Sequence, residues 1–322
     1  MLKLARHVTL RQLQIFEAIG RLKNFSRAAE ELFLTQSTVS TQVKHLTELA
    51  GMPLVEVVGK KTYLTEAGEI LYHACQDVIN RLDNAEMAFS DLKGIKKGTL
   101  KVSVITTAKY FAPEVLGKFW QLYPGVEVSL NVNNKENVLQ RLANNEDDLY
   151  ILGHNPPKDL EIEAIAFASN PIYVMASKEH PLAKQNKRIS LKTLAEEALI
   201  LREPGSGIRD VVEKLFATKG LKPNVRMILS NNEAIKHALI GQLGISVLSL
   251  HTILLEGAKG PIALLNVEGY PVQRKWHLVY RKGRELSVVA QSFVDFLRDE
   301  GKRLSQQVDK LAHEIDPRLS NK

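Results

Sequence analysis

Cysteine is almost absent from the sequence, which holds only Cys75 among its 322 residues. One cysteine cannot form an intramolecular disulfide, a thiolate zinc site or the disulfide framework of a secreted protein. Long apolar runs are missing as well, and none approaches the ~20 residues needed to span a bilayer. Because Lys3, Arg6 and Arg11 interrupt the first twenty residues, no apolar signal core can form there. These absences predict a cytoplasmic protein with no membrane partner.

The sequence signatures of common enzyme classes are missing too. The nine histidines show no H-x-x-x-H or H-E-x-x-H spacing, and no G-x-S-x-G, P-loop or dinucleotide glycine pattern occurs. Asp147 and Asp148 are a candidate carboxylate pair, but they precede a buried-strand pattern, where local bonding explains them better. We therefore expect no catalytic residue, no metal and no cofactor. An enzyme that uses α/β lobes is kept as an alternative.

The composition is that of a globular chain with a basic excess. Hydrophobic residues make up 44% and charged residues 25%, which allows ordinary cores and argues against wholesale disorder. The length suggests two or three domains. The net charge of +7 and the pI of about 9.3 favour a polyanionic partner. A basic soluble protein without such a partner is the alternative.

Residues 24–50 show the pattern of a helix-turn-helix. Apolar residues recur at helical spacing over Ser26–Phe33 and again over Gln36–Leu49, with a break at Leu34 and Thr35. An earlier helix is predicted over Thr9–Leu22, where Thr9 and Gln12 fit a capping box. The three helices would pack into one compact unit.

The polar face of this motif suits the major groove of DNA. Its hydroxyls, amides and cations are short enough for close approach, and they donate and accept at base edges and phosphates. The predicted DNA contacts of the motif are Ser26, Arg27, Gln36, Ser37, Thr38, Ser40, Thr41 and Lys44. A small helical bundle with a solvated polar face is the alternative.

A wing is predicted after the helix-turn-helix. Two short strand patterns, Leu54–Val58 and Thr62–Leu64, surround a turn that contains Lys60 and Lys61. A hairpin with lysines at its tip can touch the phosphate backbone or the minor groove. Lys60 and Lys61 are therefore predicted phosphate contacts, and residues 1–65 form the predicted DNA-binding domain.

A long helix is predicted from its cap, Thr65, to Lys93, because no Gly or Pro occurs between Glu69 and Lys93. Apolar residues along it alternate in steps of four and three over about three heptads, which is typical of a helix that pairs with a second copy. The predicted dimerisation residues are Leu71, Cys75, Val78, Leu82, Ala85, Phe89 and Leu92. A helix that lies on its own chain's core is the alternative. We interpret Cys75 as a buried small hydrophobe rather than a redox sensor.

A basic hinge, Lys93–Gly98, follows, so residues 66–97 form the predicted linker helix and hinge. Strand and helix patterns then alternate, which predicts a parallel sheet with right-handed crossovers. In this first lobe the predicted buried strands are Thr99–Ile105, Val126–Asn131 and Leu149–Leu152, and the helices are Phe111–Tyr123 and Asn134–Asn144.

A second series of strands and helices forms the second predicted lobe. Its strands are Ile172–Ala176, Leu199–Leu201, Val225–Leu229 and Ile245–Leu250, and its helices are Ile208–Lys219 and Asn232–Gln242. A strand at His277–Tyr280 and a helix from Leu286 onward return to the first lobe. The effector-binding domain is thus predicted at 98–322, with lobe I at 98–168 plus 271–300 and lobe II at 169–270. Two α/β lobes joined by two crossing strands form the architecture of periplasmic binding proteins. The charged, weakly amphipathic stretch Asp299–Lys322 suggests no role.

Polar segments follow three predicted strands at the place where open α/β folds bind ligands. Helix amino termini at these places favour anions. Two arginines after the strand at Leu199–Leu201, Arg202 and Arg209, could each form a bidentate pair with a phosphate or a carboxylate. The candidate effector-binding residues are Thr106, Thr107, Lys109, Asn133, Asn134, Lys135, Arg202, Ser206, Gly207 and Arg209. We expect a small polyanionic metabolite between the lobes. Ordinary helix caps and a common turn are the alternative.

Three amino-terminal motifs resemble the LysR-type transcriptional regulators, and the likeness runs over nearly the whole chain. They are A-A-x-x-L at Ala28–Leu32, T-Q-S-T-V-S at Thr35–Ser40 and L-T-x-A-G at Leu64–Gly68. The family often carries arginines in the wing, where this chain has Val57 and Lys60, so phosphate contacts would rest on the two lysines. The stretches VGKKTYLTEAG, TTAKYF and DDLYILG resemble the subgroup that regulates carbon-fixation (RuBisCO) operons.

The resemblance implies an α/β protein with a winged helix-turn-helix, a long linker helix and a two-lobed effector domain. It implies a transcriptional regulator that binds double-stranded DNA at a partly palindromic promoter site. Its dimers would often pair into homotetramers, and RNA polymerase is a further candidate partner. The implied effectors are sugar bisphosphates, phosphoenolpyruvate-like acids or NADPH. A non-phosphorylated carboxylate that controls another operon is the alternative, and a solute-binding protein for uptake is disfavoured by the helix-turn-helix.

Overall fold

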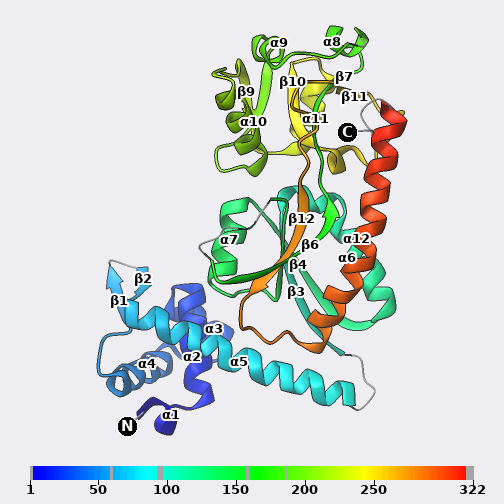
Figure 1. Cartoon of the computed structure of the whole chain (residues 1–322). Coiled ribbons are helices and arrows are strands. Elements are labelled where there is room, and N and C mark those ends of the chain that lie inside the picture. Colours follow the sequence, from blue (N-terminus) through cyan, green and yellow to red (C-terminus); the bar gives the residue numbers. More distant parts are fainter. Residues whose placement is uncertain are drawn as a thin grey trace. The chain divides into compact units, whose positions relative to one another are not determined.

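The chain folds into two compact units, Met1–Gly94 and Ile95–Lys322, shown in Figure 1. The computed structural model describes residues 3–58, 61–92, 97–154, 156, 160–185 and 187–316. Within these ranges no helix is both long enough and apolar enough to cross a membrane.

The first unit begins with four helices, of which α2, α3 and α4 have side-chain caps at their starts. They are α1 (Lys3–His7), α2 (Leu10–Leu22), α3 (Phe25–Glu31) and α4 (Gln36–Ala50). The predicted capping box is confirmed, since the Thr9 side chain accepts from the Gln12 N–H and the Gln12 side chain accepts from the Thr9 N–H. Thr35 caps α4, and Gly51 ends it in the left-handed conformation at φ 72°.

A two-stranded wing and a long helix complete this unit. Strand β1 (Val55–Val58) pairs antiparallel with β2 (Lys61–Leu64), and α5 spans Glu66–Leu92. The start of α5 packs on α2, where Tyr72 and Cys75 are buried beside Phe16. The helices approach closely at Gly20, because an added Cβ there would lie 2.3 Å from Cδ2 of Tyr72. Only glycine fits this contact without a shift.

Lobe I of the second unit contains a five-stranded sheet in the order β4-β3-β5-β12-β6. Its strands are β3 (Lys97–Ile105), β4 (Gly125–Asn133), β5 (Leu149–Leu152), β6 (Ile162–Ser169) and β12 (Lys275–Arg281). The associated helices are η1 (Thr106–Tyr110), α6 (Ala112–Leu122) and α7 (Lys135–Ala143). β3 runs parallel to β4 and β5, whereas β12 runs antiparallel to β5 and β6.

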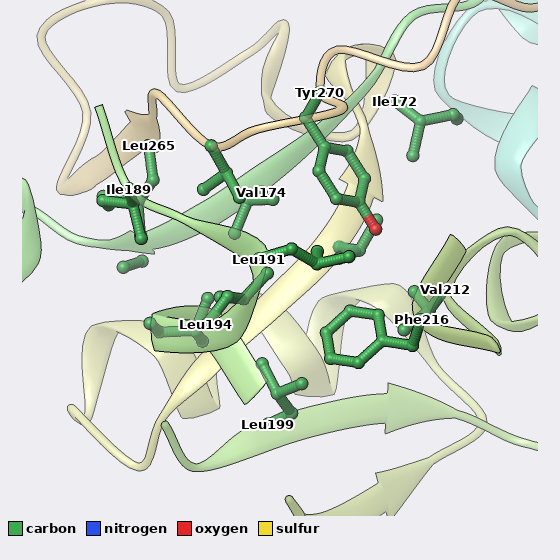
Figure 2. Close-up of a cluster of buried hydrophobic side chains, with 14 of the residues drawn as sticks. Ile172, Val174, Ile189, Leu191, Leu194, Leu199, Val212, Phe216, Leu265 and Tyr270 are labelled. Carbon is green, nitrogen blue, oxygen red and sulfur yellow. The ribbon is translucent and has the colours of Figure 1, made fainter. Parts of the chain in front are cut away.

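Lobe II contains a second five-stranded sheet in the order β11-β7-β10-β8-β9. Its strands are β7 (Ile172–Ser177), β8 (Leu199–Arg202), β9 (Val225–Leu229), β10 (Ile245–Ser249) and β11 (Ile262–Leu265). Its helices are α8 (Pro181–Lys184), α9 (Leu191–Glu196), α10 (Gly207–Thr218), α11 (Asn232–Ile240) and η2 (Leu250–Ile253). Figure 2 shows Leu191 between Leu194 and Phe216 in this view, within the core on one face of this sheet that also contains Val212.

The last helix, α12 (Val288–Ile315), packs on both lobes and runs from orange to red in Figure 1. In lobe I its Gly301 touches β6, and an added Cβ there would lie 2.1 Å from the backbone oxygen of Phe167. Farther along, Val308, Leu311 and Ala312 are buried in the core of lobe II. The stretch from Asp299 to Ile315 is therefore structural, which the sequence did not suggest. Residues 317–322 lie outside the described part.

The predicted architecture is confirmed, with several corrections of detail. Both sheets are mixed rather than parallel, since β7, β11 and β12 each run antiparallel to a neighbour. Lys97 and Gly98 belong to β3 instead of a hinge, and residues 93–96 lie outside the described ranges. The strand predicted as buried at Val126–Asn131 is β4, which lies at the sheet edge and is largely exposed or half-buried. β9 has the predicted bounds and is likewise an exposed edge strand. Strands β6 and β11 were not predicted from the sequence.

Candidate functional site

The predicted DNA contacts of the helix-turn-helix all lie on exposed positions of α3 and α4. These residues are Ser26, Arg27, Gln36, Ser37, Thr38, Ser40, Thr41 and Lys44. The starts of the two helices adjoin, because Ser26 Oγ donates to Gln36 Oε1 at 3.2 Å. Thr41 Oγ1 donates to the Ser37 carbonyl at 2.9 Å, so the Thr41 hydroxyl proton is engaged in a hydrogen bond within α4. In the wing Lys61 is exposed on β2, and Lys60 lies outside the described residues.

The predicted dimerisation seam of α5 divides into two parts. Leu71 and Cys75 pack into the core of their own unit, because this half of α5 lies on α2. Burial, with a smaller effect of Glu17, raises the pKa of the Cys75 thiol to about 12. Farther along, Val78, Leu82 and Phe89 are 41%, 49% and 62% exposed, and Ala85 is half-buried. The side chain of Leu92 lies outside the described part. The apolar surface left for a partner is thus shorter than predicted.

In the second unit a pocket of about 30 Å³ lies between the two lobes. We call it the inner pocket. Seven predicted effector residues line it, namely Thr106, Thr107, Asn134, Lys135, Arg202, Ser206 and Gly207. Lys109, Asn133 and Arg209 lie outside its wall. The inner pocket therefore joins the ends of β3 and β8 to the starts of α7 and α10.

The amino terminus of α10 presents unused donors to the inner pocket. Ser206 is its N-cap, but the Ser206 side chain makes no capping hydrogen bond and the residue is 8% exposed. Gly207 and Ile208, the first two helical residues, also line the wall, and N–H groups at this position have no partner within the helix. A hydroxyl and free N–H groups at the positive end of a helix favour an anion.

Neither predicted arginine is free to bind such an anion. Arg202 donates through Nε and Nη2 to the Glu203 carboxylate at 2.7 and 2.8 Å, and through Nη1 to Asn232 Oδ1 at 2.5 Å. Arg209 pairs with Glu213 at 2.7 Å. Because each guanidinium already has a carboxylate partner, these two residues add little net charge to the site.

Arg274, which the sequence analysis did not single out, supplies the positive charge of the inner pocket. It precedes β12, and its Nη1 donates to the Gly207 carbonyl at 2.9 Å. Among the described residues, no carboxylate forms a salt bridge with it. Burial lowers its pKa, and Asp210 opposes that change, but arginine stays protonated at neutral pH. The only sequence signal was a pair of cations, Arg274 and Lys275, before a strand pattern.

Other pocket residues were missed because they are separated in sequence and belong to different elements. Asn170 Nδ2 donates to the Gly153 carbonyl at 3.1 Å, and Ser249 Oγ donates to Asn170 Oδ1 at 2.6 Å. With His154 they complete the lining. Asn170 and Ser249 are bonded to each other and to the backbone, so they shape the pocket more than they charge it.

Two contacts hold the lobes together beside the inner pocket. Lys135 Nζ of α7 pairs with Asp210 Oδ2 of α10 at 3.0 Å. Tyr110 of η1 donates its hydroxyl to Glu233 Oε1 of α11 at 2.5 Å. The Lys135 and Asp210 side chains are 30% and 48% exposed, so this pair contributes at most about 1 kcal/mol. A bound anion can therefore compete with Asp210 for Lys135.

The candidate carboxylate pair is engaged in structural contacts. Asp147 accepts from Arg141 at 2.7 and 2.9 Å, and Asp148 accepts from Arg284 at 2.6 Å. Both carboxylates are thus bonded locally. No cluster of three or more His, Cys, Asp or Glu side chains suited to a metal occurs within the described ranges.

Comparison with known families matches both units. The family described as "LysR substrate binding domain" matches residues 93–302, and "Bacterial regulatory helix-turn-helix protein, lysR family" matches residues 10–69. The HTH-type transcriptional activator CmpR of Synechocystis sp. is 50% identical over 94% of this chain and 99% of its own length. The RuBisCO operon transcriptional regulator of Acidithiobacillus ferrooxidans is 47% identical over 91% of this chain and 94% of its own length.

Solved structures agree with this assignment. The regulatory domain of CcmR from Synechocystis PCC6803, solved in complex with 2-PG, is 45% identical, with a TM-score of 0.62, and covers 65% of this chain and 99% of that one. A full-length OxyR variant from Pseudomonas aeruginosa has a TM-score of 0.72 at 23% identity, covers 94% of this chain and 96% of its own, and shows the shared fold. The relatives are transcriptional regulators and not enzymes. The chain therefore belongs to the LysR family of DNA-binding transcriptional regulators.

Proposed function

We propose that this regulator controls carbon-fixation genes, including those for RuBisCO, in response to a small phosphorylated metabolite bound between the lobes. The observation that carries the proposal is Arg274, an arginine without a carboxylate partner in the described part, beside the Ser206 hydroxyl at the start of α10. Relatives of 47–50% identity that regulate a RuBisCO operon or are named CmpR support the gene assignment. The related CcmR domain that binds 2-PG supports the ligand class.

In this proposal the ligand's phosphate lies at the amino terminus of α10. The Ser206 hydroxyl and the Gly207 N–H donate to it, and Arg274 supplies the charge. Thr107 and Asn134 donate from lobe I, and Lys135 exchanges Asp210 for the ligand. Thr106 lines the wall, but its hydroxyl donates to the Asn133 carbonyl at 3.1 Å. A ligand that contacts both lobes favours their closed arrangement, since it binds that arrangement better.

DNA binding is proposed to use the exposed polar face of α4 and the wing. Ser40 and Lys44 are our proposed groove contacts, and Lys60 and Lys61 are the proposed phosphate contacts. The predicted roles of Ser26, Arg27, Gln36, Ser37, Thr38 and Thr41 remain predictions. Ligand-dependent movement of the effector lobes would change the spacing of two recognition helices on a partly palindromic site.

LysR regulators form oligomers, and exposed apolar residues support a homodimer here. We propose that the dimer pairs through the Val78, Leu82 and Phe89 surface of α5, which is apolar and exposed. Trp120 near the end of α6 and Ile228 on edge strand β9 are 52% and 50% exposed, which supports further pairing into a tetramer. Contact with RNA polymerase and a cytoplasmic location remain predictions.

The experiment is a thermal-shift screen of the full chain. Ribulose 1,5-bisphosphate, 3-phosphoglycerate, phosphoenolpyruvate, NADPH and ATP are compared with inorganic phosphate and with non-phosphorylated carboxylic acids. A ligand that binds only the folded state stabilises it by about 2.7 kcal/mol at ~100 times its dissociation constant. We expect a selective shift with one phosphorylated metabolite, lost in Arg274→Gln and kept in the control Lys192→Gln on the exposed face of α9. A shift with a non-phosphorylated acid alone would favour regulation of another operon.

A further inference from the structure

Gln12 on α2 is a buried polar side chain that does more than complete the capping box. The residue is 6% exposed, and its Oε1 accepts from the Thr9 N–H at 2.9 Å. Its Nε2 contacts a different helix, because it lies 2.9 Å from Gln42 Oε1 and 2.9 Å from His45 Nδ1, both on α4. One side chain therefore connects the start of α2 to the middle of α4.

The backbone N–H of Thr9 determines which way the Gln12 amide faces. A backbone N–H only donates, so the amide oxygen must lie on the Thr9 side and the amide nitrogen on the α4 side. The amide nitrogen also only donates. Gln42 must therefore present its oxygen, and His45 must present Nδ1 without a proton. The hydrogen-bonding roles of all three side chains thus follow from one backbone group.

Both hydrogens of the Gln12 amide nitrogen have an acceptor on α4. The nitrogen carries two hydrogens, and the two acceptor atoms of Gln42 and His45 each lie 2.9 Å from it. A buried amide that loses its partners is costly, so the placement of α4 that pairs both hydrogens is favoured over a nearby placement that pairs neither. An apolar side chain or a carboxylate at this position would offer no donor to α4.

Apolar packing alone defines the rotation of α4 less sharply. Val39, Val43 and Leu46 are the buried residues of α4, and they belong to the same core as Phe16 of α2. Apolar contacts are non-directional, whereas hydrogen bonds have preferred distances and angles. The contacts of Gln12 therefore add a directional constraint in the middle of α4.

The two α4 residues that Gln12 contacts adjoin the exposed polar face of this helix. Gln42 follows Thr41, and His45 follows Lys44, so each lies about 100° around the helix from a residue of that face. A rotation of α4 by about 20° would move side-chain atoms that lie about 5–6 Å from the helix axis by about 2 Å. A shift of that size breaks a hydrogen bond to a base edge.

We infer that Gln12 is a positioning residue for DNA recognition, which holds Gln42 and His45 and so sets the rotation of α4. Gln12 is buried and acts through α4. This inference rests on the proposed function, which places the polar face of α4 in the major groove. It gives Gln12, Gln42 and His45 a part in sequence recognition, although none of them is among the predicted DNA contacts.

Binding of the full chain to two DNA duplexes tests the inference. One duplex is the sequence that the wild type selects from a random pool, and the other is a scrambled sequence of the same composition. Fluorescence anisotropy at one salt concentration gives both affinities, and we call their ratio the discrimination. Gln12→Met should lower the discrimination at least about fivefold, because the hydrogen bonds to α4 are lost. The affinity for the scrambled duplex should change less than about twofold, because phosphate contacts supply it.

Thr9→Ala is the matched control for the capping role of Gln12. It removes the other half of the capping box, since the Thr9 hydroxyl accepts from the Gln12 N–H at 3.3 Å, and it leaves the Gln12 contacts to α4 in place. Circular dichroism should show that both variants are folded at the assay temperature, each with a lowered melting temperature. Thr9→Ala should keep the discrimination within about twofold of the wild type, because the rotation of α4 is unchanged.

Two variants of His45 test the same contact from α4. Asparagine in His45→Asn keeps an acceptor oxygen near the position of Nδ1 and should keep most of the discrimination, whereas His45→Leu removes the acceptor and should lower it. Gln12→Met combined with His45→Leu should lose no more discrimination than Gln12→Met does by itself, because both changes remove the same interaction.

Each other outcome has a definite meaning. Full discrimination in Gln12→Met, when Ser40→Ala loses it, would overturn the inference and leave the proposed function intact. Equal losses in Thr9→Ala and Gln12→Met would do the same, because they would assign the effect to the cap. Additive losses in the double variant would show that His45 acts independently of Gln12 and would also overturn the inference. Full discrimination in both Ser40→Ala and Gln12→Met would overturn the proposed groove contacts of α4 together with the inference.

Discussion

His251 lies in a buried aromatic cluster between the lobes, and we predict that its protonation destabilises the second unit. Its ring centroid lies 5.2 Å from that of Phe111 and 5.6 Å from that of Trp276. Nε2 lies 2.9 Å from the Ser169 carbonyl oxygen, which can only accept, so the neutral ring donates there. Complete burial lowers the pKa of His251 to about 4, against an opposing effect of the Ser169 hydrogen bond.

The magnitude follows from proton linkage. The unfolded chain binds a proton at His251 near pH 6.5, whereas the folded chain binds it only near pH 4, so stability falls as the pH is lowered through this window. At about 1.36 kcal/mol per pKa unit, the loss is about 2 kcal/mol between pH 7 and pH 5 and about 3 kcal/mol at pH 4. His251→Gln removes the titration and keeps a side-chain donor for the Ser169 carbonyl.

Urea unfolding followed by tryptophan fluorescence measures this effect. The chain has two tryptophans, Trp120 and Trp276, and both belong to the second unit, so the signal reports its unfolding alone. Between pH 7 and pH 5 the wild type should lose about 2 kcal/mol more than His251→Gln does. Equal losses in the two proteins would refute the burial argument, because other titrating groups are common to both.

Three further predictions concern DNA binding, pairing and packing. Ser40→Ala should weaken operator binding by about 1–3 kcal/mol and leave the dimer intact, as measured by mobility shift; unchanged discrimination between operator and random DNA would contradict this. Leu82→Glu places a charge on the exposed apolar surface of α5 and should shift the chain towards monomer in sedimentation, whereas an unchanged sedimentation coefficient would exclude that surface. Gly301→Ala would bring a methyl group 2.1 Å from the Phe167 backbone oxygen and should destabilise the second unit by about 3 kcal/mol or more in urea unfolding; a cost below about 1 kcal/mol would show that α12 shifts freely.

The sequence predicts those features of the fold that local signals determine. The Thr9 capping box and the bounds of strands Leu149–Leu152 and Val225–Leu229 agree with the structure, because caps and apolar runs act over a few residues. Whether a strand is buried depends on its place in the sheet, which residues nearby in sequence do not determine. Val225–Leu229 has the apolar composition of a buried strand, but its place at the sheet edge leaves it exposed.

The charge of the candidate site depends on partners that a sequence does not show. Arg202 is the last residue of β8, close to its predicted place after the strand, yet it pairs with Glu203, the next residue, and so adds little net charge to the pocket. Arg274 gains its position from the chain's return through the crossing segment, about 70 residues beyond the start of α10. Cys75 fits a heptad seam, but the helix packs it against its own unit.

The most direct test of the central claim is a mobility-shift titration of the full chain on DNA from upstream of RuBisCO genes. The affinity or the number of bound dimers should change when a phosphorylated metabolite that binds the cleft is added to the wild type. The change should disappear in Arg274→Gln and persist in Lys192→Gln, while all three proteins bind DNA alike without ligand. DNA binding that no phosphorylated metabolite alters, or a response that survives Arg274→Gln, would contradict effector sensing through this cleft.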